Sequence, residues 1–251
     1  MTAAVLSPVR PATGTARPTG PSFTKLTGLE MRKSLSTRSG KAVAVAAVLL
    51  APIGIFLVSL TADGTAPGAL ILGISGMLTA LVLLSLGVLS TAGEWGNRSI
   101  QTSFLLVPRR GRVLAAKGAA MAVLGSVFAA VSVGLSTAIL STVREVAWDN
   151  TGQAIATVVV AGAAFAVIGS GIGASVGNAP AALTGTYLTV LGILPVVHTL
   201  KPVIAEKLDP AAAIVTIAEN GPATTPILVI TGWVVVSTVA GTVITRRRAV
   251  Q

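Results

Sequence analysis

The sequence predicts an all-α membrane protein with six transmembrane helices and both termini in the cytoplasm. Three observations support this fold class. Hydrophobic residues make up 53% of the 251 residues and charged residues only 10%, and the mean hydropathy of +0.85 is unusual for a water-soluble domain. Six stretches of about 20 residues contain no Asp, Glu, Lys or Arg. Basic residues gather in the segments on one side of these stretches.

The six uncharged stretches match the length that a helix needs to cross a bilayer. At a rise of 1.5 Å per residue, about 20 residues span a hydrocarbon layer of roughly 30 Å. Strands of a membrane barrel are shorter and alternate polar with apolar residues, which these stretches do not. The predicted helices cover approximately residues 42–60, 69–91, 118–141, 154–176, 181–200 and 226–245. Together they form one transmembrane domain over residues 42–245.

The distribution of basic residues predicts the orientation, because Lys and Arg in short flanking segments are retained in the cytoplasm. Of the 18 Lys and Arg residues, only Arg144, Lys201 and Lys207 fall on the side opposite to the termini. Residues 246–251 form a basic C-terminus on the cytoplasmic side. Only two of the 8 acids, Glu30 and Glu94, lie on that side. We therefore expect a multi-pass protein of the plasma membrane.

The first 40 residues are basic and rich in Pro, Thr and Gly, and they contain no apolar core. They are not an ordinary secretory signal, and we expect residues 1–21 to be a disordered cytoplasmic tail. A cleaved signal over residues 42–60 is an alternative, but that stretch is long and five more spans follow it.

The connection between the second and third predicted helices, residues 92–117, is long and strongly basic. Within it, Ile100, Phe104 and Val107 recur at helical spacing, and Pro108 ends the pattern. This pattern predicts a short amphipathic helix along the cytoplasmic surface. Two interpretations are open. The helix can rest among lipid headgroups with Trp95 as an anchor, or it can dock into a cytoplasmic partner and transmit force.

The same connection resembles the cytoplasmic loop of ABC-2 type transporter permeases. The family pattern is an acid, a Gly with a small polar residue, a short helix, a Pro, a basic residue and a downstream Lys. The matching residues here are Glu94, Gly96, Ile100, Leu105, Pro108, Arg109, Arg112 and Lys117. The chain departs from the pattern where Asn97 and Arg98 precede the small polar Ser99.

Two further likenesses extend this resemblance over nearly the whole chain. Residues 22–41 are similar to the amphipathic elbow helix that precedes the first span in such permeases, with Phe23, Leu26 and Leu29 on one face. Thr27 and Glu30 have the spacing of a capping box, which is a weak signal. The partly apolar outer loop, residues 201–225, is similar to the family segment that often holds short extracellular or re-entrant helices.

The resemblance implies a transport subunit rather than an enzyme. Two such permeases, identical or homologous, form one pore, and cytoplasmic ATPase subunits that bind ATP and Mg drive it. This chain has no G-x-x-x-x-G-K-[ST] loop, so we expect it to bind no cofactor itself. By resemblance, a coupling helix between the second and third spans enters a cleft of the ATPase. The residues assigned to this interface are Glu94, Gly96, Ile100, Phe104, Pro108, Arg109, Arg112 and Lys117.

Other features bear on packing and on the classes of function. Small residues allow close helix packing in membranes, so Gly169, Gly173 and Gly177 predict a packing face, within one subunit or at a dimer seam. The chain has no Cys and a single His, which predicts no metal site. No soluble domain presents a basic face for nucleic acid. Apolar spans favour a hydrophobic or amphiphilic substrate, such as a drug, an antibiotic or a lipid.

The sequence supports an ATP-driven exporter as the first hypothesis. A secondary transporter driven by an ion gradient is an alternative, but it normally needs ionisable groups inside its spans, and the six predicted spans hold no Asp or Glu. His198 lies at the outer end of the fifth span, where an interfacial polar role is commoner than a proton relay. A non-transporting membrane scaffold that binds another protein through the basic connection is the third hypothesis.

Overall fold

The computed structural model describes residues 21–61, 64–96, 110–143 and 145–248. Within these residues, six helical segments are long and apolar enough to cross a membrane. This confirms the predicted all-α architecture of six candidate spans. They are α2 (Arg38–Ser59), α3 (Gly68–Gly96), α5 (Arg110–Val143), α6 (Thr151–Val176), the run of α7 (Ala179–Tyr187), η1 (Leu188–Ile193) and α8 (Leu194–Leu200), and α11 (Thr224–Arg247).

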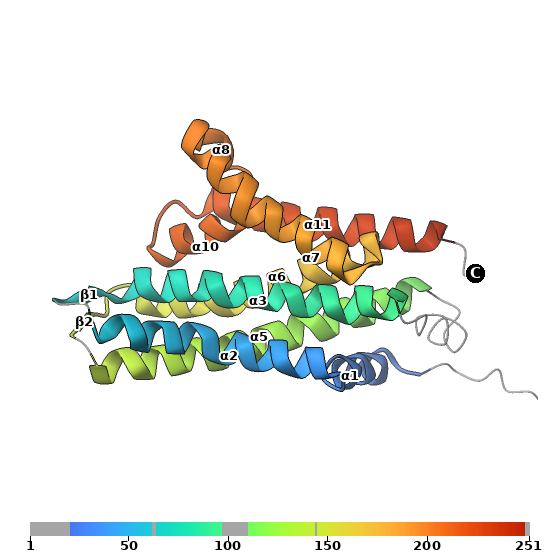
Figure 1. Ribbon diagram of the computed structural model, residues 1–251, viewed down its shortest axis with the longest axis horizontal. Helices are drawn as coiled ribbons and strands as arrows, with labels where there is room; N and C mark the ends of the chain where they lie inside the picture. The colour runs from blue at the N-terminus through green and yellow to red at the C-terminus, as the bar shows by residue number, and fades with distance from the viewer. Residues whose placement is uncertain (1–20, 62–63, 97–109, 144, 249–251) are drawn as a thin grey trace, which may run out of the picture.

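Helices α3 and α6 form the centre of the bundle, with α2 and α5 on one side and α7 and α11 on the other (Figure 1). The buried core lies mainly along α3, α5 and α6, and its largest fully buried apolar side chains include Phe165, Leu83 and Leu86. Helix α1 (Phe23–Ser34) and the last turns of α11 lie at the same end of the bundle (Figure 1). We call this end, which also holds the start of α5, the basic end.

Glycines determine how closely α3 and α6 approach. A Cβ on Gly169 would overlap the carbonyl oxygen of Leu84, and a Cβ on Gly173 would lie 2.8 Å from the carbonyl oxygen of Val88. Both glycines therefore lie in a contact within the chain. Gly177 has a different position, because it is the C-cap of α6 with φ +70°, in the left-handed region that favours glycine.

The second and third spans are longer than the sequence predicted. Helix α3 has 29 residues and ends at Gly96, while α5 has 34 residues and begins at Arg110. At 1.5 Å per residue they measure about 44 Å and about 51 Å, more than a hydrocarbon layer of roughly 30 Å requires. Much of the predicted connection 92–117 thus belongs to the two helices, and its middle, residues 97–109, lies outside the described residues.

The fifth span is interrupted by six residues of π-helix between α7 and α8. Pro195 follows this segment and has no N–H to donate to the carbonyl of Leu191, which its ring also crowds. A π-helical turn shifts the hydrogen bonding by one residue and accommodates that loss. Beyond the π segment, α8 diverges from the bundle (Figure 1).

The connection of residues 201–225 contains α9 (Pro202–Ala205) and α10 (Pro210–Ala218). Asp209 caps α10 by accepting hydrogen bonds from the N–H groups of Ala211 and Ala212. The apolar face of α10 packs back against α3, α6 and α11, and its Ile214 is fully buried. At the same end, β1 (Ala66–Pro67) pairs in parallel with β2 (Val146–Ala147).

Helix α1 begins five residues before the position that the predicted capping box requires. Its N-cap is Ser22, whose hydroxyl accepts from the N–H of Lys25, while Thr27 lies inside the helix and donates to the carbonyl of Phe23. The weak capping signal at Thr27 and Glu30 was therefore wrong. Glu30 does not cap the helix because its side chain points into the bundle.

Candidate functional site

The basic end joins α1, α3 and α5 through buried charges. Helix α1 buries one face, formed by Leu26, Glu30 and Ser34 at a spacing of four residues, and this face packs mainly on α5. Its apolar Phe23 and Leu29 point away from the protein and are 43% and 51% exposed. Of its polar members, Glu30 contacts Lys117 of α5, and Ser34 hydrogen-bonds to Ser90 of α3.

Four side chains form this ion cluster: Glu30 and Lys33 from α1, Glu94 from α3 and Lys117 from α5. The Nζ atom of Lys117 lies 2.8 Å from Oε1 of Glu94 and also contacts Oε2 of Glu30. The Nζ atom of Lys33 lies 2.8 Å from the same Oε1 of Glu94 and 3.9 Å from Oε1 of Glu30. The two acids and two lysines balance in charge.

Lys117 is the centre of the cluster, since its side chain is only 2% exposed while that of Lys33 is 36% exposed. Its ammonium group has three donors, and three acceptors surround it: Glu94, Glu30 and the carbonyl oxygen of Ser90 at 3.3 Å. A hydrogen bond of 2.8 Å between the hydroxyls of Ser34 and Ser90 adds a second link from α1 to α3.

Burial explains why these charges occur together. Removing a charged side chain from water costs several kcal/mol, and only close partners of opposite charge with further hydrogen bonds offset that cost. The two acids at the basic end, Glu30 and Glu94, are both buried in the cluster. The arrangement fixes the last turns of α3 and the first turns of α5 to each other and to α1.

The predicted interface residues fall into three groups. Glu94 and Lys117 come together, but inside the bundle rather than on its surface. Gly96 is exposed at the end of α3, and Arg112 is half-buried in the first turn of α5. Ile100, Phe104, Pro108 and Arg109 lie outside the described residues.

Two members of the cluster, Glu30 and Lys33, were not among the predicted site residues. A signal for them was present in the sequence. Glu30 and Glu94 are the two acids on the predicted cytoplasmic side, within an excess of basic residues. An isolated acid among many basic residues is a candidate for an ion pair, and in the structure the partners of these acids are Lys117 and Lys33.

A second contact at the basic end joins the ends of α11, α6 and α3. The guanidinium of Arg248 donates to the carbonyl oxygens of Ser175 at 2.6 Å and Val176 at 3.1 Å. It also lies 5.0 Å from the centre of the Trp95 ring, in the range of a cation–π contact. The last carbonyls of a helix have no partner within the helix, so Arg248 stabilises the C-terminus of α6.

We expect Arg248→Ala to destabilise the basic end by about 1.5–3 kcal/mol, the usual worth of hydrogen bonds to a charged group. The measurement is the thermal unfolding midpoint of the purified protein in detergent, together with the emission wavelength of Trp95 in a variant whose other two tryptophans are replaced by Phe. Arg247→Ala is the matched control, because the neighbouring side chain is exposed. Equal midpoints for Arg248→Ala and the parent protein would contradict this role.

No protein-family model matches the chain, and no curated protein matches it significantly. A functional proposal therefore rests on the arrangement of the chain's own residues.

Proposed function

We propose that this chain is the transmembrane permease subunit of an ABC-2 type exporter, and that it moves a hydrophobic or amphiphilic substrate outward. Separate cytoplasmic ATPase subunits, which bind ATP and Mg, supply the energy. A second permease subunit completes the pore. The basic end faces the cytoplasm, in keeping with the retention of Lys and Arg on that side.

The observation that carries this proposal is the ion cluster at the two helix ends that flank residues 97–109. Glu94 lies two residues before the end of α3, and Lys117 lies two turns after the start of α5. Because Lys117 pairs with both Glu94 of α3 and Glu30 of α1, a force applied to the segment between α3 and α5 moves three helices together. A transport subunit that is driven through this connection needs such a rigid attachment.

The length of the helices supports the same function. Since α3 and α5 exceed the hydrocarbon thickness, both are long enough to extend at the basic end into the headgroup region or beyond it. The cluster thus lies where a cytoplasmic protein can act on the adjacent segment. Helix α1 lies beside them with its apolar Phe23 and Leu29 outward, which suits an elbow helix on the membrane surface.

An ion-gradient-driven transporter has less support. Secondary transporters place their coupling-ion sites near the middle of the membrane. In the described ranges, the buried acids are Glu30 and Glu94, both at the basic end and both paired with lysines. His198 is exposed at the opposite end, in α8.

Charge reversal tests the coupling role. We expect Arg109→Glu combined with Arg112→Glu to weaken binding of the ATPase, or to uncouple ATP hydrolysis from transport, by about tenfold or more, because reversed charges repel where opposite charges attracted. The protein is purified with a tag from cells of its native host, and the copurifying ATP turnover is measured per mole of this chain.

Lys25→Glu serves as the control, since Lys25 is an exposed cation on α1 outside the ion cluster. Both variants are first shown to insert in the membrane and to elute as single species. Unchanged ATPase binding and coupling in the Arg109 and Arg112 variant would refute the coupling role. Transport by the purified chain without any ATPase would refute the proposed function as a whole.

A further inference from the structure

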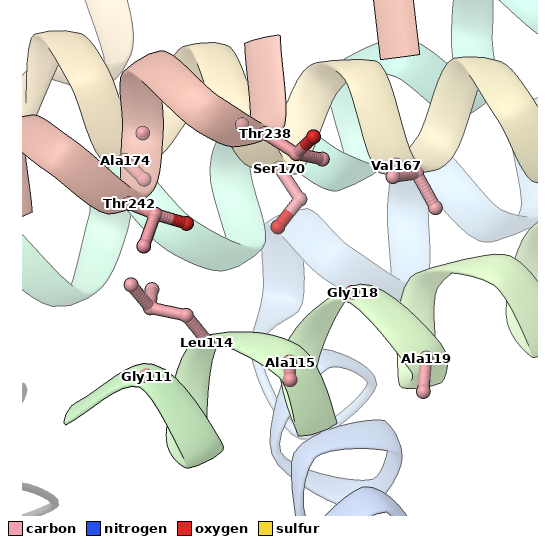
Figure 2. Close-up of a pocket in the computed structure, with 12 residues that line it drawn as sticks. Gly111, Leu114, Ala115, Gly118, Ala119, Val167, Ser170, Ala174, Thr238 and Thr242 are labelled. Atoms are coloured by element: carbon pink, nitrogen blue, oxygen red, sulfur yellow. The ribbon is translucent and has the colours of Figure 1, made fainter. Parts of the chain in front are cut away.

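An open groove runs between α5 and α11 near the basic end. Both helices pack along α6, but they hardly touch each other, so a groove remains between them with α6 as its floor. The groove has a volume of about 340 Å³. Small residues line its α5 wall, namely Gly111, Ala115, Gly118 and Ala119. Figure 2 shows Thr242 of α11 and Ser170 of α6 beside this space, although the hydroxyl of Ser170 is hydrogen-bonded to that of Thr91 on α3.

Glycine keeps the groove open. Gly118 lies at the middle of the α5 wall, and a Cβ there would meet nothing within 4 Å. The space beside Gly118 is therefore empty. The contact between α6 and α11 on the floor is close, since a Cβ on Gly241 would lie 2.7 Å from the carbonyl oxygen of Gly171. The floor is thus fixed by packing, whereas the α5 wall leaves room for an occupant.

Cations stand at the mouth of the groove on both walls. Arg246 follows Thr242 by one turn and Thr238 by two, so it continues the lining face of α11. Its Nη2 lies 3.0 Å from the position that a Cβ of Gly111 would take, at the start of α5. Arg112 shares a face with Ala115 and Ala119 on the opposite wall.

The chain offers these arginines no acid of its own in the described part of the basic end. Glu30 and Glu94 are buried in the ion cluster and neutralised by Lys33 and Lys117. An apolar groove of this kind, with unneutralised arginines at its cytoplasmic mouth, matches an anionic phospholipid, which has apolar chains below a negative phosphate.

We propose that an anionic phospholipid of the inner leaflet binds in this groove, with its phosphate at Arg246 and Arg112 and one acyl chain over Gly118 and Ser170. A helix from a second copy is less suited to the groove. A second copy in parallel orientation buries its own acids at this depth, Glu30 and Glu94, and would therefore bring no anion to Arg246 and Arg112. The proposal requires a membrane-spanning chain but does not depend on an ATPase partner.

Native mass spectrometry of the full chain in detergent tests this binding, with phosphatidylglycerol as the probe and phosphatidylcholine of the same acyl chains as the reference. We expect at least one phosphatidylglycerol to bind more tightly than phosphatidylcholine. Arg246→Gln should lower the affinity for phosphatidylglycerol by about fivefold, the equivalent of about 1 kcal/mol per basic residue near the headgroups. Gly118→Leu should remove the acyl-chain space and abolish the preferred binding.

Gly134→Leu is the matched control on the same helix, because a Cβ there also meets nothing within 4 Å but Gly134 lies outside the groove lining. Lys25→Gln controls for general loss of positive charge. Both controls should retain the parent affinity for phosphatidylglycerol. Equal binding of the two lipids by the parent protein would overturn the proposal, and so would full phosphatidylglycerol binding by Gly118→Leu. A parent dimer that Gly118→Leu converts to monomer would assign the groove to a second copy instead.

Discussion

Replacing Lys117 by Met is expected to destabilise the protein by about 3–5 kcal/mol, which is the usual cost of removing one partner from a buried ion pair. Methionine fills a similar volume, so the loss comes from charge rather than from a cavity. Without Lys117, Glu94 and Glu30 share a buried site with Lys33 as the one remaining cation of the cluster. The measurement is the free energy of unfolding in mixed detergent micelles, followed by circular dichroism.

A double variant separates electrostatics from packing. Lys117→Met with Glu94→Gln leaves one acid, Glu30, beside one lysine, Lys33, and thus restores neutrality in the cluster. We expect it to recover about half of the lost stability, because the two sites are in direct contact and their effects do not add. A double variant that is less stable than the single one would show that the cluster contributes through shape instead.

Lys41→Met is the control for the charge of lysine as such. Lys41 is exposed in the first turns of α2, at the same end of the bundle. A surface substitution of this kind changes stability by about 0.5 kcal/mol or less. If Lys41→Met and Lys117→Met were equally stable, the buried position of Lys117 would have no energetic consequence.

The number and approximate positions of the spans were predictable from the sequence, because membrane helices must be apolar over a fixed length. The helix ends were not predictable by the same rule. Polar and charged residues such as Glu94 and Lys117 ended the predicted spans at 91 and 118, although both continue the helices. The pairing of Glu94 with Lys117 offsets the free-energy cost of burying their charges. A prediction of spans from hydropathy scores each residue alone and therefore misses this compensation.

The pairing itself depends on the third dimension. Glu94 and Lys117 are 23 residues apart, and Glu30 is on a separate helix. Nothing in local spacing shows that α1 turns its Glu30 face onto α5 instead of its Phe23 and Leu29 face. The presence of two acids, Glu30 and Glu94, on a strongly basic side indicated part of the cluster. The groove between α5 and α11 gave none, because it arises from the way both helices pack on α6.

Gly169→Leu is expected to destabilise the bundle by about 3 kcal/mol or more, at the upper end of the usual cost of overpacking. A Cβ on Gly169 would overlap the backbone carbonyl of Leu84, and on the facing helix a Cβ on Gly87 would overlap the carbonyl of Ala166. Backbone atoms cannot move aside as side-chain ends can. The two central helices would have to separate, and in lipid no hydrophobic force holds them together.

The series Gly169→Ala, Gly169→Val and Gly169→Leu tests this cause, because the loss should already be large with Ala, whose Cβ is the clashing atom. Gly152→Leu is the matched control on α6, since Gly152 is exposed and a Cβ there meets nothing within 4 Å. The readouts are the thermal midpoint and the fraction of protein that elutes as a single species from size exclusion. A parent-like midpoint for Gly169→Ala would mean that α3 and α6 are farther apart than backbone contact. In that case the stability of the centre would come from side chains such as Phe165 and Leu83, which are fully buried on the same two helices.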